Sequence, residues 1–164
     1  MSDRSSLTAI TSNTRSFLET VWPDWQLEKH RRFGDPMPSI MSYSTCARSS
    51  TFIQKVMDEI GVAAEVRHGW FRTEKSEAPW GPDDRHTWVA SGSWFVDVTA
   101  DQFGADKIIV TDISDSRYCS DIDVALPEFQ LRRIQSVLEI WERWLRSPMR
   151  EKLFAECRTL MTPS

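Results

Sequence analysis

Three residues could together perform nucleophilic chemistry: Cys46, His86 and Asp97. A thiolate attacks carbonyl carbons, and a neighbouring imidazole can take the thiol proton and later return it to the leaving group. A carboxylate that accepts the second ring N–H of the imidazole holds the ring in the required orientation. Their joint use depends on the elements that carry them.

Cys46 opens a predicted helix over residues 46–60, which has an apolar stripe and ends before Gly61. Ser44 and Thr45 offer hydroxyls to cap its start. Unpaired backbone N–H groups and the helix dipole stabilise a thiolate at this position, and the N–H groups could also bind an oxyanion. The alternative for a single cysteine is a small buried hydrophobe.

His86 and Asp97 lie on two predicted strands, at residues 86–90 and 94–99. Both strands are rich in Val and Trp, which is typical of strands. The short link Ser91-Gly92-Ser93 predicts that they form a hairpin.

The predicted hairpin brings Asp97 close to His86. With Ala90 opposite Trp94, Asp97 lies opposite Thr87 and next to His86, so its carboxylate could accept a ring N–H. The alternatives are a structural histidine and an aspartate that faces water from an edge strand.

The order and contexts of these residues resemble the transglutaminase-like branch of the papain-like cysteine enzymes. The family pattern is a Cys opening a helix that ends in "lGi-a-v", a strand, then "H-x-W-V", a hairpin and "W-x-x-D-x-T". The matching segments here are Cys46 with Ile60-Gly61-Val62-Ala63-Ala64-Glu65-Val66, then His86-Thr87-Trp88-Val89, then Trp94-Phe95-Val96-Asp97-Val98-Thr99. The match spans about residues 43–103 and leaves residues 1–40 and 112–164 uncovered.

The resemblance implies that Cys46 is the nucleophile, His86 the general base and acid, and Asp97 the residue that orients His86. The implied reaction is acyl transfer from a peptide or protein amide through a thioester, without cofactor or metal. Family members act as proteases, glutamine deamidases, transglutaminases or peptide amidases. We expect hydrolysis or deamidation, because the short chain leaves little room for a second substrate site; transglutaminase-type exchange is a further alternative.

The oxyanion partner departs from the family pattern, because no Gln shortly precedes Cys46 as it does in papain-type proteases. Tyr43, or the more distant Gln26 or Asn13, could assist the Cys46 backbone N–H. Gln102, after the Asp97 strand, is a secondary polar candidate.

Two tryptophans are candidates for the substrate cleft. Trp88 follows His86 on the same strand, and Trp80 lies in a polar loop that could cover the site. The alternatives are core packing and a plain solvent loop.

Composition narrows the remaining classes. The 164 residues fit a single domain over 1–164, with a net charge of −4 and three cysteines, too few for a disulfide framework. The chain has neither a membrane span nor an apolar signal core, so a cytoplasmic protein is expected, although delivery as a secreted effector is compatible. The short basic run Lys29-His30-Arg31-Arg32 alone does not predict nucleic-acid binding.

The other predicted elements complete an α+β domain, papain-like or transglutaminase-like, with the Cys46 helix on a small antiparallel sheet between terminal helices. Helices are predicted at 4–21, 127–146 and from Pro148 to about Leu160, and strands at 62–72 and 107–111. Pro23 is predicted to end the first helix, residues 29–44 to be irregular and residues 112–125 to form an acidic loop.

A second class of function stays open: a non-catalytic interaction module on the same scaffold, with the acidic loop and the C-terminal helix as its surface. The size is compatible with a bacterial or phage setting. The sequence identifies neither the substrate nor the oligomeric state.

Overall fold

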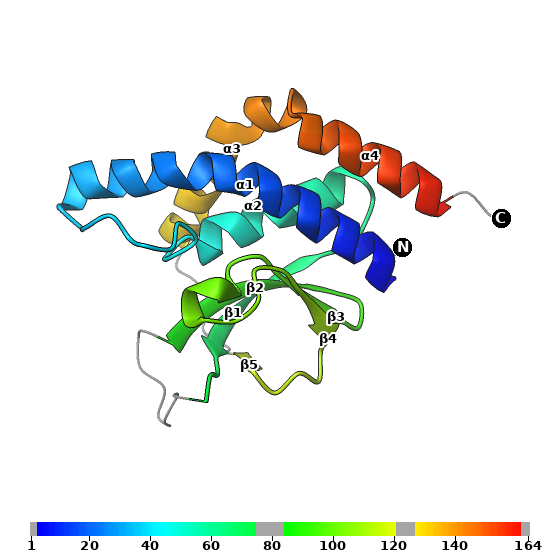
Figure 1. Ribbon diagram of the computed structural model, residues 1–164, viewed down its shortest axis with the longest axis horizontal. Coiled ribbons are helices and arrows are strands. Elements are labelled where there is room, and N and C mark those ends of the chain that lie inside the picture. The colour runs from blue at the N-terminus through cyan, green and yellow to red at the C-terminus, as the bar shows by residue number, and fades with distance from the viewer. Residues whose placement is uncertain (1–2, 75–83, 121–126, 162–164) are drawn as a thin grey trace.

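The structure is a computed structural model that describes residues 3–74, 84–120 and 127–161. Within these residues the chain is α+β, with four α-helices in one layer and a curled five-stranded sheet beneath them (Figure 1). The elements are α1 (Arg4–Phe33), α2 (Cys46–Glu59), β1 (Glu65–Phe71), β2 (Arg85–Ser91), β3 (Trp94–Asp97), η2 (Ala100–Phe103), β4 (Ile109–Asp112), β5 (Tyr118–Ser120), α3 (Pro127–Leu145) and α4 (Pro148–Met161).

The first helix runs through the proline that was predicted to end it. Pro23 lies inside α1 and is exposed, whereas Trp22, Trp25 and Gln26 around it are buried. A proline inside a helix costs about 3 kcal/mol, and burial of two tryptophans offsets a penalty of that size. The helix ends instead at Gly34, which has a φ of 72° and whose N–H donates to the His30 carbonyl.

The sheet is antiparallel throughout, in the order β4-β3-β2-β1-β5. The hairpin between β2 and β3 pairs Ser91 with Trp94 and Ala90 with Phe95, so its loop has two residues. The predicted three-residue loop was therefore wrong by one residue. Gly92 opens the turn with a φ of 58°, and a glycine at this first position is typical of type II′ hairpins.

Two hydrophobic cores occupy the two faces of the sheet. The helix-facing core packs α1, α2, α3 and α4 against one face, where Val89 and Val96 point. The second core fills the other, concave face, and consists of Phe71, Trp88, Ala90, Phe95, Ala100, Ile109 and Tyr118. The helix-facing core thus fixes α2 on the sheet, and the second core surrounds the side chains of His86 and Asp97.

The remaining elements follow the predictions closely, with one omission. The helices α2, α3 and α4 and the strands β2 and β4 lie within a few residues of their predicted positions. The omission is β5, three residues inside the predicted acidic loop, which pairs with the edge of β1. No helix in the described part of the chain is long and apolar enough to cross a membrane.

Candidate active site

The thiol of Cys46 lies at the first residue of α2 and is half-buried. The turn before it is well anchored, since the Thr45 hydroxyl donates to the Ser42 carbonyl and accepts from the Ser49 hydroxyl, at 2.8 and 3.1 Å. Ser44 has a φ of 61°, in the left-handed region that non-glycine residues rarely adopt. Strained backbone of this kind persists where surrounding contacts hold it, and it is common at functional sites.

His86 and Asp97 form a buried pair. The Nε2 atom of His86 lies 2.6 Å from an Asp97 carboxylate oxygen, and the two residues are each only 2% exposed. The register of the hairpin explains the contact: Val89 pairs with Val96, so Asp97 falls on the same face of the sheet as His86 and Trp88.

The carboxylate of Asp97 has further hydrogen bonds to both of its oxygens. The Thr99 backbone N–H and hydroxyl donate to one oxygen at 2.9 and 3.3 Å. The Tyr118 hydroxyl donates to the oxygen shared with His86, at 2.9 Å. Burial opposes ionisation of Asp97, but the charge of His86 and these hydrogen bonds hold the pKa of Asp97 below its ordinary value.

The imidazole of His86 also acts electrostatically on the thiol of Cys46. The Nδ1 atom of His86 is buried and has no hydrogen-bond partner among the described residues, so it is the ring nitrogen that Asp97 does not engage. Burial opposes ionisation of the thiol, but His86 and the Thr87 backbone N–H together lower the pKa of Cys46. Burial also opposes protonation of His86, yet Asp97 and Cys46 raise the pKa of His86 to about 10. Both shifts favour the pair of thiolate and imidazolium over the neutral thiol and imidazole.

Aromatic rings pack around the imidazole of His86. The Phe103 and Phe71 rings meet it edge-on, with ring centroids 5.0 and 5.7 Å away. Trp88 stacks beside it at 6.0 Å. This packing leaves the side chain of His86 without exposed surface and fixes the ring plane, so that rotation about the His86 side chain is restricted.

Two side chains of η2 tie the loop before Cys46 to the segment after Asp97. The Gln102 amide accepts from the Ser44 backbone N–H at 3.3 Å and donates to the Thr99 carbonyl at 2.9 Å. Asp101 accepts from the Ser42 hydroxyl at 2.6 Å and from the buried Arg15 guanidinium at 2.9 Å. These contacts join the two segments that carry the thiol and the carboxylate.

The oxyanion candidates of the sequence occupy other roles. Tyr43 is half exposed, and its carbonyl accepts from the Gln26 amide, which also donates to the Met41 carbonyl. Asn13 donates to Ala9 and Glu156. Gln26 and Asn13 therefore brace the backbone and the helices, while Gln102 acts as the loop tie described above.

The two tryptophans predicted to line a substrate cleft have different outcomes. Trp88 is fully buried in the second core, so the prediction that it walls a substrate cleft was wrong: the inward face of β2 places it beneath the sheet surface. Trp80 lies outside the described residues.

Two contributors escaped the sequence prediction. Tyr118 belongs to the missed strand β5 and reaches Asp97 only because the sheet is curled. Arg15 has an inward-facing position on α1 and no local signal besides its helical spacing.

No protein-family model, curated protein or solved structure matches the chain. In the described ranges, no three His, Cys, Asp or Glu residues are grouped as metal ligands would be.

Proposed function

We propose that this protein is a cysteine-nucleophile acyl-transfer enzyme with a papain-like or transglutaminase-like fold, acting on a peptide or protein amide. One observation carries the proposal. A buried histidine contacts a buried carboxylate through one ring nitrogen, its other ring nitrogen has no hydrogen-bond partner among the described residues, and it lowers the pKa of a thiol at a helix start.

In the proposed reaction, Cys46, His86 and Asp97 each have a role in forming the thioester and in hydrolysing it. The Cys46 thiolate attacks the amide carbonyl, and the C–N bond breaks as protonated His86 gives its proton to the leaving amine. His86 then takes a proton from water, which attacks the thioester; the C–S bond breaks, the carboxylic acid leaves, and the Cys46 thiolate and protonated His86 are restored. Asp97 keeps its charge and orients the ring throughout.

Hydrolysis of a peptide bond and deamidation of a glutamine side chain are the two outcomes we propose. They differ in the carbonyl attacked and in the leaving group, which is the carboxy-terminal part of the cleaved chain, with its new amino group, or ammonia. Amide exchange with a second amine would use the same thioester.

A non-catalytic interaction module is the second candidate. The outer face of α3 favours it, because Leu131, Ile134 and Leu138 recur along the helix and are each about half exposed or more.

Selective alkylation of Cys46 tests the proposal. Iodoacetamide reacts with thiolates, and an ordinary thiol of pKa near 8.5 is only a few per cent ionised at pH 7. The lowered pKa of Cys46 predicts labelling that persists to lower pH than that of an ordinary thiol and declines only as the pH falls below that pKa. Burial and nearby carboxylates raise the pKa of Cys157, so its labelling should need a higher pH than that of Cys46.

The measurement is the labelling rate of each cysteine by peptide mass spectrometry between pH 4 and 10. We expect Cys46 to label at least about tenfold faster than Cys157 at pH 6.5. Equal rates for the three thiols would remove the basis of the proposal. The Cys46→Ala variant should keep the fold and lose turnover of a casein or peptide-amide panel.

A further inference from the structure

A groove borders the turn that carries Cys46. It lies between the second half of α1, the first turn of α2 and the amino-terminal half of α3, and its volume is about 380 Å³. Ser44 and Ala47, which flank Cys46 in the chain, line one end. A space of this size accommodates a few side chains of a bound peptide.

The lining of this groove is strongly basic. Five of its residues carry positive charges and two carry negative charges, although the whole chain has a net charge of −4. The basic residues are Lys29, Arg32, Arg48, Arg132 and Arg133. An acidic protein with a local excess of positive charge focuses anions at that place.

The four arginines of the groove differ from its Lys29, which pairs with Asp35 at 3.8 Å. Within the described residues, Arg32, Arg48, Arg132 and Arg133 form no salt bridge, unlike Arg15, Arg143 and Arg150 elsewhere. Arg48 instead lies over the Trp25 ring, 4.4 Å from its centroid. Guanidinium groups bind carboxylates through two parallel hydrogen bonds, so this row offers unused donors for them.

Charge couples the groove to the thiol. Arg133 is half-buried on α3; burial lowers its pKa, and a negative charge on Cys46 opposes that effect. The charge of Arg133, a residue of the groove, therefore interacts with the charge of the Cys46 thiolate. Trp25 and Phe129 add apolar wall to the same space.

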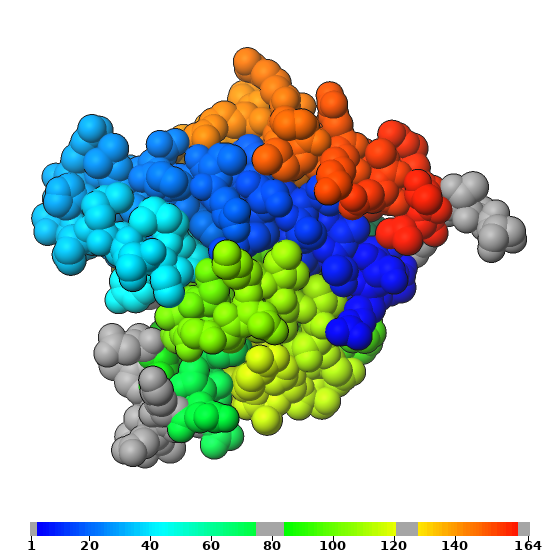
Figure 2. Space-filling view, viewed as in Figure 1, coloured from blue at the N-terminus to red at the C-terminus, as the bar shows by residue number. Residues whose placement is uncertain are grey.

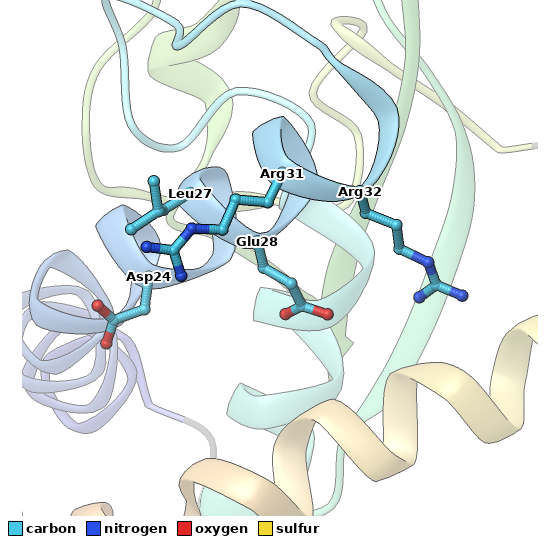
Figure 3. A pocket seen from close by; sticks show the side chains of 5 residues that line it. All are labelled: Asp24, Leu27, Glu28, Arg31 and Arg32. Carbon is cyan, nitrogen blue, oxygen red and sulfur yellow. The ribbon is translucent and has the colours of Figure 1, made fainter.

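The basic run at the end of α1 borders two adjoining spaces. Arg32 lines both the groove and a neighbouring pocket, which it shares with Arg31, Asp24, Leu27 and Glu28. Figure 3 shows the Arg31 and Arg32 side chains pointing away from each other. Because the carboxylates of Asp24 and Glu28 lie among these arginines, the run does not form a continuous positive track for a phosphate backbone, and a peptide is the better fit.

We propose that this basic groove binds a carboxylate-rich segment of the substrate polypeptide, next to the amide that Cys46 attacks. The inference rests on the proposed function for the position of that amide. The recognition itself rests on the unpaired guanidinium groups and would stand without turnover.

Binding by the Cys46→Ala variant tests recognition apart from catalysis. The probes are two fluorescein-labelled nonapeptides with a central Gln, flanked on both sides by four Glu or by four Gln. We expect fluorescence anisotropy at 50 mM NaCl to give about tenfold tighter binding of the Glu peptide. The preference should fall several-fold at 200 mM NaCl, because salt screens exposed charges.

Matched charge variants locate the binding. In the Cys46→Ala background, Arg32→Gln with Arg132→Gln should abolish the preference for the Glu peptide. Arg146 is an exposed arginine beyond the end of α3 that pairs with Glu142, and Arg146→Gln should leave the preference unchanged. Both arginines in the double variant are exposed, so thermal unfolding should confirm an intact fold.

Three results would overturn the inference: equal affinity for the two peptides, a preference that survives the double variant, or equally tight binding of a single-stranded RNA of the same charge. A different result separates the two proposals. The wild-type protein could bind the Glu peptide through the groove and yet turn over neither this peptide nor any other amide. That result would contradict the acyl-transfer function and support the binding site.

Discussion

The two faces of the sheet differ in what they bury. On the helix-facing side, a large hydrophobic cluster joins the sheet to all four helices, with Phe17, Phe52 and Trp144 in mutual ring contact. The polar side chains buried beside it are mostly neutral, such as Thr11, Thr14 and Ser49. On the concave side, the second core encloses two ionisable groups, His86 and Asp97, among aromatic rings. Space-filling Figure 2 shows how closely the helical layer lies on the strands.

This contrast separates stability from chemistry. An apolar core gains free energy from any well-fitting hydrophobic set, so its members are exchangeable. A buried ion pair is a weak source of stability, and it persists only with good geometry and full hydrogen bonding. The second core therefore maintains a charge arrangement that the helix-facing core does not need.

The largest expected effect comes from comparing Asp97→Ala, in the second core, with Leu18→Ala, in the helix-facing core. Removing the carboxylate leaves His86 and Tyr118 without their partner, at a cost of about 3–5 kcal/mol in unfolding free energy. Leu18 is fully buried in the helix-facing core, so Leu18→Ala should lower the free energy of unfolding by about 2–5 kcal/mol. Urea denaturation measures both losses.

Cys46 alkylation then distinguishes the two variants. Only loss of Asp97 should slow labelling per folded molecule at pH 6.5, by about tenfold, because the imidazolium that stabilises the thiolate is lost. Asp97→Asn, with nearly the same shape, provides the comparison if the alanine variant fails to fold. Unchanged labelling in both aspartate variants would show that the buried pair is structural.

The next effect concerns the two tyrosines of the chain. Tyr118→Phe removes one hydrogen bond to a buried carboxylate, and we expect a loss of about 1.5–3 kcal/mol. The half-exposed Tyr43 is the matched control, and Tyr43→Phe should change stability by less than about 0.5 kcal/mol. Thermal unfolding measures the stability of both variants. Equally small losses for Tyr118→Phe and Tyr43→Phe would contradict a stabilising hydrogen bond from Tyr118 to Asp97.

The smallest effect should come from the loop tie. Gln102→Ala removes two hydrogen bonds at a partly buried position, for a loss of about 1 kcal/mol, and should slow Cys46 alkylation a few-fold because Ser44 is released. Gln54→Ala is the control, since its amide also donates to a backbone carbonyl, that of Ala64. If both glutamine variants slowed alkylation equally, the tie between Ser44 and η2 would have no special part in holding the thiol.

Most elements were predictable because their signals are local. The apolar stripes of α2 and α3 and the Gly92 turn are visible in a short window of sequence. Pro23 misled the prediction of α1 because a local penalty was weighed without the burial of Trp22 and Trp25, which lies in tertiary contacts. The strand β5 was missed because three residues carry too little periodicity to be recognised.

The sequence by itself determined the thiol at a helix start, the histidine and the aspartate on neighbouring strands, and their order. Tertiary structure decided which of them meet. A strand has a side-chain period of two, so the one-residue difference in hairpin register moves the residue opposite Asp97 from Thr87 to Trp88. That shift puts Asp97 on the face of His86, and the curl of the sheet then brings Tyr118 to the same carboxylate. Neither result follows from local sequence, because both depend on how distant strands pair and bend.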